Sequence, residues 1–191
     1  MQESVSLVAS WLDSVDLETA TDRIADAHAW NRAKDADGPT WNSLASSTGD
    51  LSRISLHEAS HAVVGYSLGA NVSRACMRAD GSGAVDGVAA DPVSRIVTTL
   101  AGIFGELLFC ETDRYREYSL GRSTDILTAR QRIAEMEVFA PTWEPTNKAF
   151  AIMSCCTVLS NRVAILRVAG ALVYCGELDG AAIAALCGRL Q

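Results

Sequence analysis

The spacing of apolar and polar positions predicts a chain built mainly from helices. Between residues 51 and 69, apolar side chains return every three or four positions without an interrupting proline, and Gly69 is a suitable C-terminal stop. The same spacing predicts a helix over 92–108, with Asp91 as its cap. Further helices are expected at 123–136, 147–158 and 160–176, with a short one after Gly180. The C-terminal helices have wide apolar faces, so we expect a helical bundle packed against the core or a partner chain.

Two stretches depart from this helical pattern. Residues 72–78 and 84–88 read as strands joined by a glycine-containing turn at 79–83, which is a small β-hairpin. An exposed hairpin edge can add an extended peptide as a further strand, but a connecting hairpin without a substrate role fits the pattern equally well. The segment 140–145 contains two prolines and predicts a break between helices.

The first fifty residues are predicted to be an appendage to one main domain at 51–191. Residues 1–34 read as two helices, and 35–50 are loop by composition. Of the 191 residues, 49% are hydrophobic and 20% are charged, which is typical of a globular protein with a sizeable core. The predicted fold class is therefore mainly α, with a small β-hairpin and a C-terminal helical bundle.

Composition also narrows the partners and the compartment. A net charge of −7 disfavours binding to nucleic acid or to anionic membranes, because both call for basic surfaces. The sequence has no apolar run long enough for a membrane span and no signal-peptide pattern in its first 30 residues. None of the six cysteines forms a C-x-x-C pair. These features together favour a cytoplasmic location.

The chemistry of the chain is concentrated at residues 57–61, which read His-Glu-Ala-Ser-His, an H-E-x-x-H pattern within a predicted helix. Residues four apart lie on one helix face, so His57 and His61 can direct two imidazoles at one Zn²⁺. Glu58 lies one step around the helix, where it can take a proton from a metal-activated water that attacks a carbonyl. The same residues could be a surface pair, but two of the three histidines fall at this spacing. The third, His28, reads as exposed.

A zinc site with two histidines needs a third protein ligand, and the spacing alone leaves its identity open. Asp125 lies in the first turn of the helix at 123–136, which is a rigid platform for a ligand, although an acid there also compensates the helix dipole. The other acidic candidates are Glu106, Asp113, Glu117 and Asp86. Glu106 stands out within an apolar helix, either as half of a local salt bridge or as an acid that orients a metal ligand.

Four stretches together resemble the FtsH-type zinc metallopeptidases, the protease domains of membrane-bound AAA proteases. Residues 57–65 read His-Glu-Ala-Ser-His-Ala-Val-Val-Gly and are similar to the H-E-A-G-H-A-x-x-G helix of that family. Three more stretches follow in the family's order, similar to its G-G-R-A-A-E-E-L-I-F helix, its G-A-S-N-D-L-x-x-A segment and its N-R-x-x-L…L-D-G-x-x-I run. They lie at 101–109, 121–129 and 161–183. The resemblance covers about residues 51–190.

The resemblance implies a zinc-dependent endopeptidase that hydrolyses peptide bonds of peptides or unfolded proteins. The aspartate of the third stretch is the third zinc ligand in the family, which selects Asp125. Zn²⁺ would then be held by His57, His61 and Asp125, with Glu58 as the general base and water in the fourth position.

The chain departs from the family pattern in three respects. Ser60 replaces a glycine, and Ile103 and Phe104 replace arginine and alanine before Glu106. The sequence also contains neither an ATPase module nor a membrane helix, so substrate unfolding would need a separate ATPase partner, and assembly into a homo-oligomer stays open. The alternative function is a non-catalytic, zinc-stabilised adaptor or assembly module. Glu58 argues against that alternative, because a structural zinc site needs no such acid.

Overall fold

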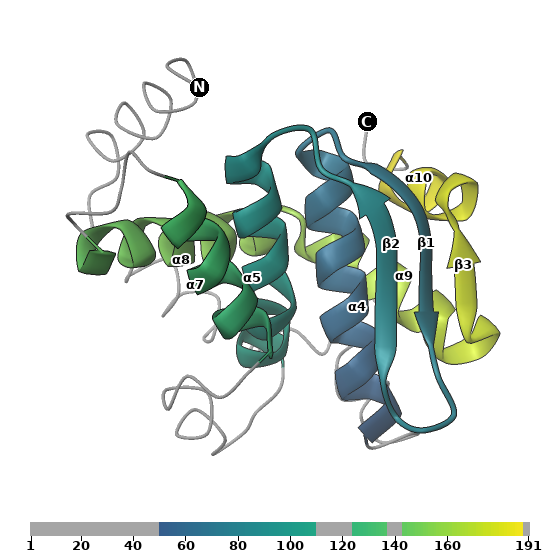
Figure 1. Cartoon of the computed structure of the whole chain (residues 1–191). Helices are drawn as coiled ribbons and strands as arrows, with labels where there is room; N and C mark the ends of the chain where they lie inside the picture. The colour runs from purple at the N-terminus through teal and green to yellow at the C-terminus, as the bar shows by residue number, and fades with distance from the viewer. Residues whose placement is uncertain (1–49, 110–123, 137–142, 189–191) are drawn as a thin grey trace.

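The computed structural model describes residues 50–109, 124–136 and 143–188, which form a mainly helical fold with one small sheet (Figure 1). The helices are α4 (Asp50–Ser67), α5 (Pro92–Phe109), α7 (Thr124–Glu135), α8 (Trp143–Ser160), α9 (Arg162–Cys175) and α10 (Gly180–Gly188). The strands are β1 (Asn71–Met77), β2 (Gly83–Val88) and β3 (Glu177–Asp179). The predictions for residues 1–34 and 35–49, and the candidate acids Asp113 and Glu117, fall outside the described residues. Asp50, predicted as loop, is the first residue of α4.

Helix α4, which carries both histidines of the motif, lies at the centre of this arrangement. It packs against α5 on one side and against the sheet and α9 on the others (Figure 1). Its fully buried apolar residues are Leu56, Ala59, Ala62, Val63 and Val64. Helix α5 approaches closely because Gly105 faces Ser60, and a Cβ at Gly105 would lie 3.2 Å from the main-chain oxygen of Leu56. Packing on several sides therefore holds the motif in a rigid frame.

The sheet is antiparallel with the order β2-β1-β3, which confirms the hairpin predicted at 72–88. Strand β3 was not predicted, because three residues are too few to show an alternating pattern. Gly176 ends α9 in the left-handed conformation at a φ of 72°, and its N–H donates to the Leu172 oxygen at 2.8 Å. Its own oxygen accepts the Met77 N–H at 2.8 Å, which brings β3 alongside β1. Strand β2 therefore forms an edge of the described sheet.

Most predicted helix boundaries agree with the structure. Helix α4 ends just before Gly69, whose φ is 79°, and α5 is capped by Asp91, which accepts the Ser94 N–H at 2.9 Å. The break expected at 140–145 is partly wrong, because α8 begins at Trp143. Pro145 lies in the first turn of α8, where a missing N–H removes no intrahelical hydrogen bond.

The C-terminal helices pack against the histidine-bearing core, as their apolar faces predicted. Helix α8 lies against α5 and α9 lies against α4, with Phe150, Ile165 and Leu172 fully buried. Among the described residues, no single helix is long and apolar enough to cross a membrane. Ala149–Ser160 and Arg162–Cys175 reach that length and composition only as a pair, which is bent by 76°.

Candidate metal centre

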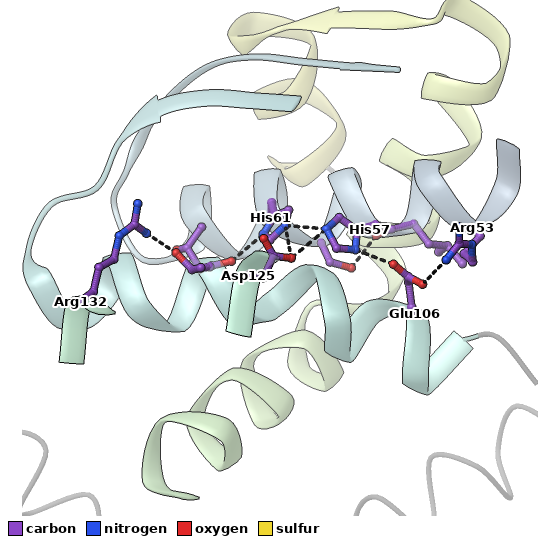
Figure 2. Close-up of polar contacts among 10 residues, drawn as sticks. Arg53, His57, His61, Glu106, Asp125 and Arg132 are labelled. Carbon is purple, nitrogen blue, oxygen red and sulfur yellow. Dashed lines mark hydrogen bonds and ion pairs between the residues drawn. The ribbon is translucent and has the colours of Figure 1, made fainter. Parts of the chain in front are cut away.

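Three side chains from two helices converge at the middle of α4. His57 and His61 come from successive turns of α4, and Asp125 comes from the first turn of α7 (Figure 2). The two Nε2 atoms lie 3.0 Å apart, and Asp125 Oδ2 lies 3.0 Å from Nε2 of His57 and 3.4 Å from Nε2 of His61. Their side chains are 13 to 22% exposed, so an ion and a water molecule can reach them. The structure thus brings together the three residues that the sequence and the resemblance selected.

Hydrogen bonds on the far side of each imidazole determine which nitrogen faces the cluster. His61 Nδ1 lies 2.7 Å from the main-chain oxygen of Thr98, which can only accept, so Nδ1 carries the proton. His57 Nδ1 lies 2.6 Å from Glu106 Oε1 and donates to that carboxylate in the same way. With the Nδ1 proton directed outward, each ring turns its Nε2 toward the other ring and toward the Asp125 carboxylate. The two Nε2 atoms and the Asp125 carboxylate are all hydrogen-bond acceptors, so they need a proton or a metal ion between them.

In the absence of a metal, these groups hold a proton. Burial alone would lower the pKa of His57, but its hydrogen bonds to Asp125 and Glu106 outweigh burial and raise the pKa to about 10. Burial alone would raise the pKa of Asp125, and its hydrogen bonds to His57 and His61 instead hold the pKa well below its usual range. A proton held by these groups would compete with a metal for the same Nε2 and carboxylate atoms.

The donor set and its spacing fit Zn²⁺. Zinc bonds of about 2.0–2.1 Å in a tetrahedron put neighbouring ligand atoms about 3.3 Å apart. The three separations of 3.0, 3.0 and 3.4 Å match that value closely without a movement of the helices. Two imidazoles and one carboxylate would leave a fourth position open, which is the arrangement of a catalytic rather than a structural zinc site.

Glu58 lies beside this cluster without belonging to it. The residue is 7% exposed, and the three atoms that could hold one ion come from the two histidines and Asp125. Burial raises the pKa of Glu58, while the positive charges of the imidazoles partly oppose that rise. A buried carboxylate next to a metal position, but outside the ligand set, has the position that a proton acceptor requires.

The other candidate acids have different surroundings. Glu106 combines both roles considered for it, because Oε1 accepts from His57 while Oε2 lies 3.3 Å from Arg53 Nη1. It therefore orients a candidate ligand and neutralises an arginine at once. Asp86 lies on the hairpin, where its carboxylate is 2.8 Å from the guanidinium of Arg74. Asp86 is thus paired across the strands and lies outside the cluster that could hold a metal.

Sequence reasoning missed the part that Gly102 plays in this geometry. Gly102 lies on α5 against both rings, and a Cβ there would be 2.6 Å from Nε2 of His57 and still closer to Nε2 of His61. The added carbon would therefore lie where an ion held by both Nε2 atoms would bind. Gly102 falls in the family-like stretch at 101–109, but a glycine in a helix says nothing about its partner until α4 and α5 are placed together.

Two comparisons with known proteins leave the family of this chain open. No model of a known protein family matches the chain, and no curated protein matches it either.

Proposed function

We propose that the protein is a zinc-dependent endopeptidase that hydrolyses peptide bonds of peptides or unfolded proteins. The observation that carries this proposal is the convergence of three atoms that could hold one metal ion beside a buried carboxylate, Glu58, that lies outside that set. The four ordered stretches that resemble FtsH-type metallopeptidases support the same conclusion. A structural zinc site needs no proton acceptor beside it, and the buried Glu58 carboxylate therefore favours a catalytic site.

The side chains present support a division of labour for this reaction. Zinc bound to His57, His61 and Asp125 would polarise the peptide carbonyl and activate water. Glu58 would accept the proton of the attacking water and then give it to the leaving amine. Glu106 holds the His57 ring in the tautomer that ligates through Nε2.

The hairpin offers a way to hold the peptide. Strand β2 begins at Gly83, where an added Cβ would lie 2.5 Å from the carboxyl carbon of Glu58. The side of β2 that faces away from β1 pairs with no strand of the described sheet. An extended peptide can add to such an edge as a further antiparallel strand, which would carry its backbone past Glu58. A folded substrate cannot add in this way, so we propose that unfolding by a separate ATPase precedes its cleavage.

The test is cleavage of an unfolded protein, with the metal removed and restored. Purified protein with one equivalent of zinc should cut reduced, carboxymethylated casein, and mass spectrometry should show each product pair heavier than its parent segment by one water. A chelator should stop the reaction and zinc should restore it. If the zinc-loaded protein binds zinc tightly but cuts no unfolded protein or peptide, the adaptor function replaces this proposal.

A further inference from the structure

Near the candidate metal centre, the Thr99 hydroxyl contacts the guanidinium of Arg132 and the main-chain oxygen of Arg95. Arg132 Nη1 donates to Thr99 Oγ1, and Thr99 Oγ1 donates to the main-chain oxygen of Arg95 at 2.8 Å. Burial lowers the pKa of Arg132 and the charge of Arg95 lowers it further, while Glu135 and Asp125 oppose the shift without reversing it, so the two guanidinium groups lie within electrostatic reach of each other. Across the described ranges, neither arginine has a carboxylate within ion-pair distance. A protein with a net charge of −7 therefore keeps a local positive pair.

This pair lies in line with the candidate ligands. Arg132 follows Asp125 by seven residues on α7, which is two turns, so both side chains share a helix face about 10 Å apart along the axis. Thr99 directly follows Thr98, whose oxygen holds His61. Figure 2 shows the resulting row of polar side chains, with Arg132 at one end and the candidate ligands in its middle.

The hairpin gives a direction to any peptide that passes this row. Strand β2 runs from Gly83, beside Glu58, to Val88, which lies four residues before the start of α5 at Pro92. A peptide added antiparallel to β2 would run from the Val88 end toward Glu58. The residues before the cleaved bond would therefore lie toward the first turns of α5, which carry Arg95 and Thr99. An extended chain rises about 3.3 Å per residue, so the separation of about 10 Å between Asp125 and Arg132 corresponds to about three substrate residues.

We propose that Arg132 and Arg95 form a specificity site for an aspartate or glutamate located about three residues before the cleaved bond. This proposal rests on the proposed peptidase function. Guanidinium groups bind carboxylates through paired, charge-assisted hydrogen bonds. Thr99 already orients the Arg132 side chain, so less side-chain freedom is lost when a substrate binds. Since both arginines stay in contact with solvent, we expect a preference for Glu over Gln of roughly 5- to 10-fold.

The experiment uses matched peptides that differ only by Glu or Gln at one position, scanned from two to four residues before the bond that mass spectrometry identifies as cleaved. The zinc-loaded parent should give a kcat/KM ratio of roughly 5 to 10 for Glu over Gln at one of these positions. The ratio should fall to about 1 in Arg132→Gln and should drop in Arg95→Gln, which alters only an exposed side chain. The control is Arg130→Gln, an exposed arginine on the same helix, which should keep the parent ratio.

A second readout does not depend on turnover. Fluorescence anisotropy of the labelled peptides with a zinc-loaded Glu58→Gln variant should show the same Glu preference, and the added Arg132→Gln change should abolish it. If the parent cleaves peptides without preferring an acid, or if the preference survives in the Arg132→Gln, Arg95→Gln double variant, the acid site is wrong and the peptidase stands. If the zinc-loaded parent cleaves none of the peptides and no unfolded protein, the peptidase proposal itself fails, and the acid site fails with it.

Discussion

Replacing Gly102 by alanine should remove zinc binding while leaving the protein folded. The new methyl carbon would lie 2.6 Å from His57 Nε2 and 2.7 Å from Cε1 of the same ring. Non-bonded heavy atoms keep about 3.5 Å, and a zinc ion must come within about 2.0–2.1 Å of each Nε2. The methyl and the ion therefore compete for one volume.

The size of the effect follows from how the rings are held. Both rings must turn away from the methyl. Turning His61 would break its 2.7 Å hydrogen bond to the Thr98 oxygen, at a cost of about 0.5–1.5 kcal/mol, and turning His57 would break its hydrogen bond to the Glu106 carboxylate, at a cost of about 1.5–3 kcal/mol. Alanine in place of glycine inside a helix stabilises by about 0.8–1.0 kcal/mol, which offsets only part of that cost. The free energy of unfolding of the metal-free protein should thus fall by about 1–4 kcal/mol. Zinc affinity should fall at least about 100-fold, or about 2.8 kcal/mol.

The assay is a zinc titration in competition with a chromophoric chelator, together with urea unfolding of the metal-free protein. Gly188→Ala is the matched control, because a Cβ at Gly188 has no atom within 4 Å among the described residues. It should bind zinc as the parent does. A Gly102→Ala protein that binds zinc within threefold of the parent would contradict the position we assign to the metal.

Two further predictions concern the groups around the metal. The pKa of His57 is raised to about 10 without metal, so below pH 10 its ring is protonated and zinc must displace that proton. Titration calorimetry at pH 7.5, in buffers of different ionisation enthalpy, should show that zinc binding releases at least one proton, and the apparent zinc affinity should rise with pH up to about 10. Zinc binding without proton release would contradict the shared-proton geometry. Glu106→Gln should weaken zinc binding about 10- to 100-fold, because the neutral amide no longer holds His57 with a charge. The control is Glu135→Gln, an exposed change on α7, which should leave the zinc affinity unaltered. Equal zinc affinity in both variants would show that Glu106 does not orient His57.

The parts of this geometry that depend on short-range periodicity could be predicted from the sequence. A four-residue spacing within one helix places His57 and His61 on one face whatever the rest of the chain does. The Asp91 cap and the hairpin were predictable for the same reason. The mainly helical fold followed from the repeated apolar spacing, but β3 escaped because it has only three residues and depends on the turn at Gly176.

Contacts between distant segments needed the structure. Asp125 was one of several acids until the resemblance selected it, because nothing local to α7 points to α4. Glu106 was noticed as an acid in an apolar helix, but its simultaneous contacts with His57 and Arg53 depend on how α4 and α5 pack. The Thr98 oxygen is a main-chain atom and carries no signal in a sequence.

The role that we propose for Glu58 is proton transfer in a zinc-dependent hydrolysis, and the Glu58→Gln variant is its sharpest test. The measurement is the initial rate of unfolded-casein cleavage by parent and variant, each confirmed by elemental analysis to hold one zinc. The amide keeps the shape of the side chain but cannot accept a proton, so the rate should fall about 10²- to 10⁴-fold at unchanged zinc content. A zinc-loaded Glu58→Gln protein that cleaves casein as fast as the parent would contradict the account.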